Sequence, residues 1–211
     1  MTASWEEIKS LCDEAVHFNT ASVCIPQCYV KPVSDAYGDK LNICTVVGFP
    51  LGYSVTAAKV LETEQAIQNG AGEIDMVINV CDIKNGNFEA VLDEIKLIKK
   101  TCLAACKGGG IILKVIIETC FLTEDEKVRM CAIVTEAGAD YIKTSTGFGT
   151  AGATLADVEL FKKHIGANVK IKAAGGVKTR EDLEMFINAG ASRIGTSSAV
   201  KLLAGGDAAG Y

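Results

Sequence analysis

Short apolar runs alternate with amphipathic stretches along the whole chain. The runs are rich in β-branched residues and almost continuously hydrophobic, which is typical of parallel strands covered on both faces. A helical pattern from Ser4 to about Phe18 precedes the first run, and further helical patterns separate the others. The strands are expected at residues 21–25, 41–47, 73–79, 112–118, 141–146, 170–174 and 193–197. Repeated strand–helix units of this kind predict a parallel sheet.

Capping signals and a weak repeat support this division of the chain. Hydroxyl residues followed three positions later by an acid mark helix starts at Ser4, Thr123, Thr154 and Thr179. A glycine that closes a helix just ahead of a strand recurs in residues 69–74, 137–142 and 189–194. No linker rich in proline, glycine or serine interrupts the pattern. We therefore expect one domain over residues 1–211, with a flexible tail at about 204–211.

A closed barrel of the (β/α)8 type is the natural architecture for this pattern, but the chain offers seven strands. In such barrels the loops after the last two strands usually form a phosphate site. Here, glycine-rich turns follow the sixth and seventh expected strands. We therefore expect a TIM-type (β/α)8 barrel that is short of its first strand, with the missing strand placed before residue 1.

Composition narrows the possible functions and location. The 211 residues are 49% hydrophobic, enough for one sizeable core, and a formal charge of −5 argues against nucleic acid or anionic membranes as partners. Neither a signal peptide nor an apolar stretch of about 18 residues is evident. The nine cysteines include no C-x-x-C, and Cys24 and Cys44 are interpreted as small core residues. The sequence thus predicts a cytoplasmic protein without metal or disulfides.

Two lysines suggest chemistry because they interrupt apolar strands. Lys143 and Lys172 lie in the fifth and sixth expected strands, each just ahead of a glycine turn. Lysine is rarely buried without a partner or a purpose, and two neighbouring cations disfavour each other's charged form. A neutral amine is the nucleophile of Schiff-base enzymes. The alternative is that both lysines extend outward or pair with acids such as Asp75 or Glu118.

A carboxylate in the third expected strand could act with these lysines. Asp75 lies within an apolar run, with Asn79 expected on the same face. Lys114 and Glu118 share a face of the next strand and could extend the same polar interior. A purely structural ion pair is the alternative interpretation of Asp75.

Two turns are candidates for binding phosphate. Residues 174–179 and 194–198 each carry glycine and lead into a helix, where backbone N–H groups attract anions. Two such turns on successive strands, both near the lysines, favour a phosphorylated ligand more than either turn would alone.

Taken together, these segments resemble the deoxyribose-phosphate aldolase family of class I aldolases. The similarity runs from about residue 5 to the C-terminus, and the K-T-S-T-G-F segment with a downstream K-x-x-G-G is its most specific part. The segments that carry it are residues 43–50, 72–79, 114–119, 137–148, 172–177 and 193–198.

The resemblance implies a fold, a reaction and roles for individual residues. Members are (β/α)8 barrels that reversibly cleave 2-deoxy-D-ribose 5-phosphate to D-glyceraldehyde 3-phosphate and acetaldehyde, without metal or organic cofactor. By the match, Lys143 is the Schiff-base nucleophile, and Lys172 is the second lysine, which lowers the pKa of Lys143. Asp75 matches the acid/base carboxylate. Tyr211 matches a C-terminal tyrosine that helps to move a proton on the acetaldehyde carbon. The phosphate pocket is matched by Gly147, Gly175, Gly176, Val177, Gly195, Ser197 and Ser198.

The chain departs from the family pattern at its front. Relatives usually begin with a strand that carries Asp-His-Thr-x-Leu or a variant, whereas Met1 to Trp5 leads straight into a helix. The strand edges at 21–25 and 193–197 are then expected to be unpaired, and an open edge of this kind would favour a homodimer. An active aldolase is the leading hypothesis. The alternatives are a phosphosugar-binding barrel that has lost turnover, and a different phosphate-binding barrel enzyme such as an isomerase.

Overall fold

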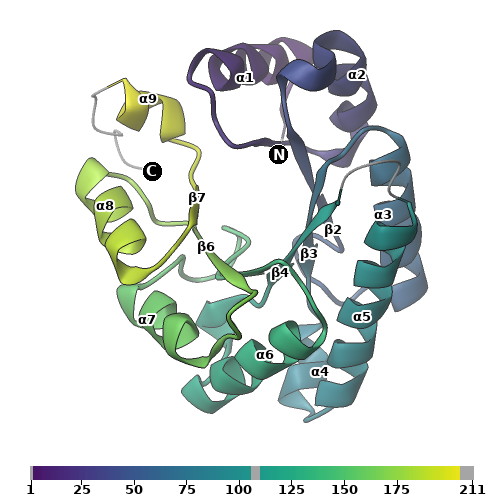
Figure 1. Ribbon diagram of the computed structural model, residues 1–211, viewed down its shortest axis with the longest axis vertical. Helices are drawn as coiled ribbons and strands as arrows, with labels where there is room; N and C mark the ends of the chain where they lie inside the picture. Colours follow the sequence, from purple (N-terminus) through teal and green to yellow (C-terminus); the bar gives the residue numbers. More distant parts are fainter. Residues whose placement is uncertain (1, 106–109, 205–211) are drawn as a thin grey trace.

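The fold is a single seven-stranded parallel sheet with helices on its outer side (Figure 1). The computed structural model describes residues 2–105 and 110–204. Neighbouring strands follow the order of the chain, so that every connection passes over the outer face. The strands are β1 (Val23–Cys24), β2 (Ile43–Val47), β3 (Glu73–Val77), β4 (Ile112–Ile116), β5 (Tyr141–Lys143), β6 (Lys170–Ala174) and β7 (Arg193–Gly195). All seven expected strands are confirmed, although most are shorter than the sequence pattern predicts.

Helices connect the strands and cover the convex side of the sheet (Figure 1). They are α1 (Trp5–His17), α2 (Gln27–Tyr37), α3 (Thr56–Gln68), α4 (Val80–Lys84), α5 (Phe88–Ala104), α6 (Glu124–Glu136), α7 (Leu155–His164), α8 (Arg180–Ala189) and α9 (Ala199–Leu203). Short 3-10 turns follow at Gly38–Lys40 and Thr119–Phe121. The four predicted hydroxyl caps are confirmed, each accepting a backbone N–H from the third helical residue. None of the helices in the described residues is long and apolar enough to span a membrane.

The two faces of the sheet differ in chemistry because strand residues alternate between them. Outward-facing residues such as Ile74, Leu113 and Ile142 join the helices in one apolar cluster. The inward face instead carries acids, lysines and thiols, several of them wholly buried. The packing between sheet and helices holds the strands in place. The inner face is therefore free to present polar side chains.

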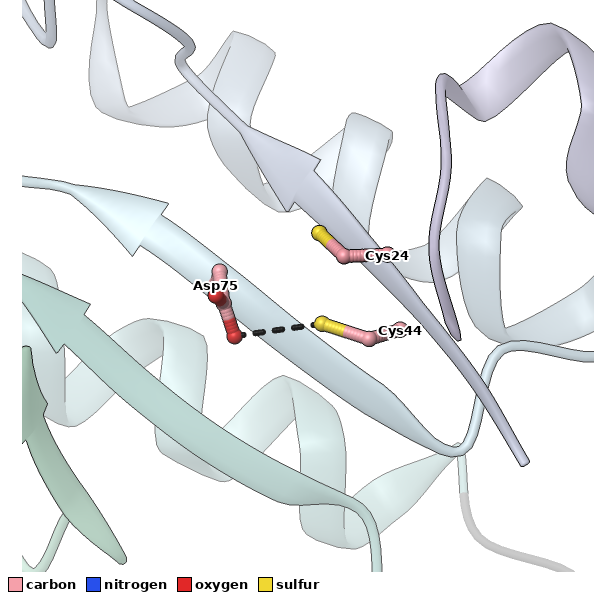
Figure 2. Close-up of side chains that lie close together, drawn as sticks. All are labelled: Cys24, Cys44 and Asp75. Atoms are coloured by element: carbon pink, nitrogen blue, oxygen red, sulfur yellow. Dashed lines mark hydrogen bonds between the residues drawn. The ribbon is translucent and has the colours of Figure 1, made fainter. Parts of the chain in front are cut away.

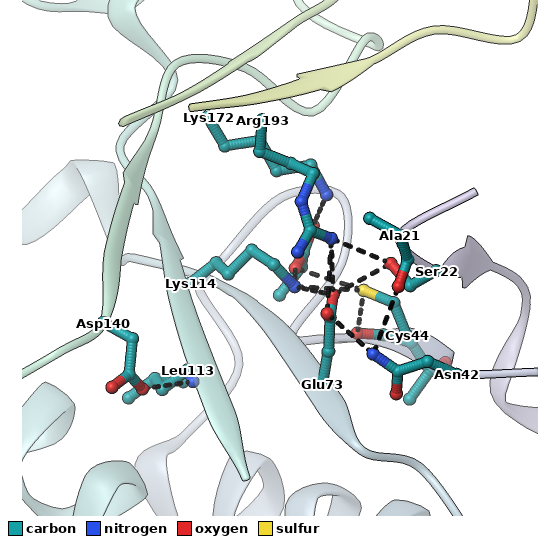
Figure 3. Close-up of polar contacts among 12 residues, drawn as sticks. Ala21, Ser22, Asn42, Cys44, Glu73, Leu113, Lys114, Asp140, Lys172 and Arg193 are labelled. Atoms are coloured by element: carbon teal, nitrogen blue, oxygen red, sulfur yellow. Dashed lines mark hydrogen bonds and ion pairs between the residues drawn. The ribbon is translucent and has the colours of Figure 1, made fainter. Parts of the chain in front are cut away.

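The sheet is open in the described residues, with β1 and β7 as its edge strands. Arg193 of β7 reaches across to the other side of the sheet and contacts the Ser22 hydroxyl at 3.1 Å (Figure 3). The same guanidinium lies 3.2 Å from the buried Glu73 carboxylate, which Ser22 also contacts at 2.9 Å. These polar contacts connect the two edges where no backbone pairing does.

Two expectations about strand ends are wrong. The fourth strand ends at Ile116, and Glu118 adopts a left-handed backbone (φ 52°), so its carboxylate leaves the face of Lys114. The third strand ends at Val77, and the Asn79 side chain caps α4 by accepting the Cys81 N–H at 3.1 Å. In both cases local turn and cap geometry overrides the strand alternation that the sequence suggests. The predicted tail lies almost entirely outside the described residues.

Candidate active site

Three lysine ammonium groups converge on one carboxylate inside the sheet. Lys143 Nζ and Lys172 Nζ lie 2.8 and 2.6 Å from Oδ2 of Asp75. Lys114 Nζ lies 2.8 Å from the other carboxylate oxygen, Oδ1. Asp75 and Lys114 are wholly buried, whereas Lys143 and Lys172 keep 5% of their surface. The only exposed surface of this cluster therefore belongs to the two lysines that the sequence singled out.

Strand register explains why residues so far apart in sequence meet here. Asp75 pairs with Lys114 across β3 and β4, and Lys143 pairs with Lys172 across β5 and β6. All four side chains point inward from adjacent strands. Neighbouring parallel strands are about 4.8 Å apart, so long lysine side chains from three strands can reach one carboxylate.

A second buried carboxylate, that of Glu73, is joined to Asp75 through Lys114. Glu73 is wholly buried, and its Oε2 lies 2.6 Å from Lys114 Nζ. The Glu73 carboxylate also pairs with the Arg193 guanidinium, which contacts Ser22 as well (Figure 3). Within this buried group four basic side chains face two carboxylates. The group therefore carries more positive than negative charge, and its like charges oppose one another at short range.

The same arrangement shifts the pKa values of its members. Burial alone would raise the pKa of Asp75, but attraction to Lys143, Lys172 and Lys114 outweighs it and holds that pKa well below its ordinary value. Burial lowers the pKa of Lys172, but its attraction to Asp75 outweighs this effect and the net pKa is raised. The pKa of Lys114 is raised for the same reason. Asp75 is therefore a carboxylate throughout the neutral range.

The geometry excludes two of the interpretations that the sequence left open, and it retains the ion pair with Asp75 as common to the catalytic and the structural interpretation. Lys143 and Lys172 point into the sheet interior rather than outward, and their acidic partner is Asp75 rather than Glu118. The Glu118 carboxylate instead accepts hydrogen bonds from the backbone N–H and the hydroxyl of Thr146. Glu118 thereby fixes the loop that follows Lys143. Asn79, engaged in its helix cap, does not belong to the cluster.

The two glycine-rich turns lie side by side next to the lysines. The Gly175 N–H donates to Gly195 O at 3.4 Å, and the Thr196 hydroxyl donates to Val177 O at 2.9 Å. A Cβ atom at Gly195 would lie 3.2 Å from Cε of Lys172. The absence of a side chain there lets the second turn approach the lysine cluster.

The first turn differs in one respect from the expectation. Gly175 and Gly176 have φ angles of 78° and 79°, which favour glycine, but α8 begins only at Arg180. The backbone N–H groups of Lys178 and Thr179 already donate to the Asp182 carboxylate. Because the N-terminus of α8 is already capped, a bound anion would contact the turn at Gly175 and Gly176 rather than the helix itself.

The remaining predicted phosphate residues lie along the same rim. Gly147 has a φ of 89°, and its Cα would lie 3.8 Å from a Cβ atom at Gly175. Val177 is buried, Ser197 is exposed and Ser198 is half-buried. The Ser198 N–H donates to the Thr196 hydroxyl at 3.0 Å. Tyr211 lies outside the described residues.

Three further side chains belong here: Lys114, which the sequence suggested only as an extension of the polar interior, and Cys44 and Ser145, which it did not assign to the site. Lys114 is a full member of the cluster, and Cys44 donates to Oδ1 of Asp75 at 3.2 Å. Ser145 is wholly buried, and its hydroxyl has no partner among the described residues. Ser145 follows Lys143 by two residues, and its Cβ lies 3.9 Å from a Cβ position at Gly175. Strand alternation was the available signal for Ser145.

Comparison with known proteins adds independent information. A family model described as DeoC/LacD family aldolase matches residues 1–205. A deoxyribose-phosphate aldolase of Clostridium botulinum (strain Alaska E43 / Type E3) is 63% identical over 209 residues, which cover 99% of this chain and 92% of that protein.

Two solved structures are similar in fold and sequence. One, described as the aldolase QR15, has a TM-score of 0.89 and 37% identity, covering 96% of this chain and 88% of its own. The other is a deoxyribose phosphate aldolase from Aeropyrum pernix, described as tetrameric. It has a TM-score of 0.87 and 30% identity, covering 96% and 84% of the two chains.

Proposed function

The chain belongs to the DeoC/LacD aldolase family, and we propose that it is a deoxyribose-phosphate aldolase, a lyase of the Schiff-base class. It would cleave 2-deoxy-D-ribose 5-phosphate reversibly to D-glyceraldehyde 3-phosphate and acetaldehyde. The observation that carries the proposal is the convergence of Lys143 and Lys172 on Asp75, beside two glycine turns that suit a phosphate group.

The proposed mechanism begins with an amine of the lysine cluster. Lys143, in its neutral form, attacks the aldehyde carbon of the open-chain sugar, and loss of water gives an iminium ion. A base of the cluster takes the proton of the C3 hydroxyl, and the iminium accepts the electron pair of the C2–C3 bond as that bond breaks. Glyceraldehyde 3-phosphate leaves and an enamine remains on Lys143. Protonation of the enamine carbon and hydrolysis then release acetaldehyde and restore the amine.

Asp75 and Lys172 would move protons in these steps. Their atoms are 2.6 Å apart, so a proton can pass between them or through one water molecule to the reacting carbinolamine. Because the protons of such a coupled group belong to the group as a whole, the cluster rather than a single residue sets the pH dependence. Tyr211 is proposed to transfer the proton on the acetaldehyde carbon, and this role rests on its match to the family alone.

The substrate's polar groups have candidate partners along the rim. The phosphate would bind to the set Gly147, Gly175, Gly176, Val177, Gly195, Ser197 and Ser198. The Ser145 hydroxyl, which has no partner in the described part of the chain, lies in the same region and could bind an oxygen of the sugar. Binding of the phosphate at a distance from the reacting bond would orient the sugar over Lys143.

The proposed function is tested by turnover with phosphorylated and unphosphorylated sugar. We expect cleavage of 2-deoxyribose 5-phosphate with release of acetaldehyde and glyceraldehyde 3-phosphate, and at least about 100-fold lower kcat/KM for 2-deoxyribose, which lacks the phosphate. A coupled assay for glyceraldehyde 3-phosphate measures the first reaction. Phosphosugar binding without cleavage, on folded protein, would refute the aldolase and favour a binding barrel.

The phosphate turn can be tested separately from the chemistry. Gly176→Ala is expected to raise KM for the phosphorylated sugar by about 10-fold and to weaken inhibition by inorganic phosphate, because the φ of 79° strains any other residue. Gly86→Ala is a matched control with φ 76° in the turn between α4 and α5, and at either glycine an added Cβ atom would meet no other atom closer than 4.0 Å. Equal effects of both variants on KM would contradict the assignment.

Assembly and location are also proposals. A homodimer is suggested by the two edge strands of the open sheet, and the tetrameric relative indicates that this fold can assemble. Eight described cysteines are free thiols, which suits the reducing cytoplasm. The reaction as proposed needs no cofactor, because the iminium formed on lysine is itself the electron sink.

A further inference from the structure

Two cysteines face each other beside the carboxylate that holds the lysines. Cys24 of β1 and Cys44 of β2 are register partners, so they lie directly opposite on neighbouring parallel strands. Their sulfur atoms and an oxygen of Asp75 all lie within 4.8 Å of one another (Figure 2). Strand neighbours are about 4.8 Å apart, within the Cα separations that disulfides span. The sequence interpretation of both residues as inert core thiols is therefore incomplete.

The two thiols differ in access and in acidity. Cys24 is exposed at the edge strand, whereas Cys44 is wholly buried. The adjacent Cys44 thiol, together with the nearby Lys172 and Lys143 charges, lowers the pKa of Cys24 to about 7, against the opposing effects of desolvation at the sulfur and of Asp75. The adjacent Cys24, burial and Asp75 raise the pKa of Cys44 well above its ordinary value. Cys24 is thus the more exposed and more acidic thiol and would react first, and Cys44 is the buried thiol that would react second.

A metal ion is the less favourable occupant of this place. Both oxygens of Asp75 already accept contacts from ammonium groups, Oδ1 from Lys114 and Oδ2 from Lys143 and Lys172. A cation bound to Asp75 would have to displace these lysines and then remain beside their positive charges. Thiol chemistry requires no such displacement, since sulfur–sulfur bond formation involves the two cysteines alone.

We propose that Cys24 and Cys44 form a dithiol modification site that low-molecular-weight disulfides oxidise to an intramolecular disulfide. The Cys24 thiolate attacks one sulfur of the small disulfide, forms a mixed disulfide and expels one thiolate. Cys44 then gives up its proton to that departing thiolate and attacks the Cys24 sulfur, which expels the second half of the reagent as a thiolate. The protein loses two electrons and the reagent gains them.

The modification would act on the lysine cluster, a consequence that rests on the proposed function. Cys44 Sγ now donates to Oδ1 of Asp75 at 3.2 Å and lies 3.5 Å from Lys114 Nζ. A bond to Cys24 removes the thiol proton and draws the sulfur toward β1. Asp75 would lose one of the contacts that orient it toward Lys143 and Lys172. We expect at least a tenfold loss of kcat/KM, reversed by a reducing dithiol.

The test uses the whole protein and oxidised glutathione, with peptide mapping as the primary readout. The expected product is a Cys24–Cys44 cross-link that consumes two of the nine cysteines and disappears on treatment with dithiothreitol. Cys44→Ser should stop at a glutathione adduct on Cys24, and Cys24→Ser should leave Cys44 unmodified. Cys81→Ser, which removes an exposed thiol on α4, is the control and should cross-link like the unchanged protein.

The possible outcomes separate this inference from the aldolase proposal. A cross-link in a protein without aldolase turnover would support the dithiol site and refute the function. Turnover that persists unchanged while Cys24 forms only a glutathione adduct, or pairs with Cys28, would overturn the dithiol site alone. Because mapping is done on the unchanged chain, misfolding of a serine variant does not affect the result.

Discussion

Lys143→Ala is expected to lower cleavage of 2-deoxyribose 5-phosphate by about 1000-fold or more, because it removes the amine proposed as the nucleophile. The same variant should no longer be trapped by borohydride in the presence of acetaldehyde. Trapping followed by peptide mapping of the unchanged protein should place the reduced adduct on Lys143 alone. The variant should remain folded, since Asp75 retains Lys172 and Lys114 as partners and the local excess of positive charge falls.

Lys143→Arg is the matched variant for this prediction. A guanidinium keeps the positive charge near Asp75 but is not a nucleophile, so this variant should also be inactive and untrappable. Inactivity of both variants would assign the loss to covalent chemistry rather than to charge. An adduct that maps to Lys172 or Lys114 instead would mean that the nucleophile has been assigned to the wrong lysine.

The sequence predicted the strands well because each carries its own signal. Apolar runs and the caps at Ser4, Thr123, Thr154 and Thr179 identify elements from a few adjacent residues, and all of them are confirmed. The ends of strands were predicted less well. Glu118 and Asn79 continue the strand pattern in sequence, but a left-handed backbone and a helix cap end the strands before them.

The site was predictable only where residues conflicted with their surroundings. Lysines 143 and 172 and Asp75 are charged residues in apolar strands, so they could be named from sequence, and their contact follows from the predicted order of strands. Cys44 and Cys24 resemble ordinary core residues in sequence. Their proximity depends on the register in which β1 pairs with β2, and no local sequence pattern specifies that register.

Asp75→Asn is expected to have the largest effect on both stability and activity. The wholly buried carboxylate holds three ammonium groups, and an amide would leave them without a counter-charge. Removing one partner of a buried ion pair typically costs about 3–5 kcal/mol in the free energy of unfolding. Loss of the proposed acid/base group should lower kcat by about a further 100-fold or more in the folded fraction. Urea unfolding and turnover measure the two effects.

The pH dependence of stability provides a second readout of the same carboxylate. The pKa of Asp75 is held well below its unfolded value, which is near 4. Its ion pairs therefore stabilise the protein above about pH 4, and this stabilisation is lost as the pH falls toward the folded pKa. At the alkaline end, the raised pKa of Lys172 stabilises the protein below about pH 10.4 and is lost as the pH rises further. Asp75→Asn should reduce both dependences.

Glu94→Gln is the control that separates the two roles of Asp75. Glu94 is buried and pairs with the wholly buried Lys59 at 2.7 Å, on the helix side of the sheet. This variant should also lose stability, but its folded fraction should cleave the substrate at nearly the original rate. If Asp75→Asn behaved in the same way, with turnover intact per folded molecule, Asp75 would be a structural counter-ion only. The proton transfers would then have to be assigned to Lys172 and water.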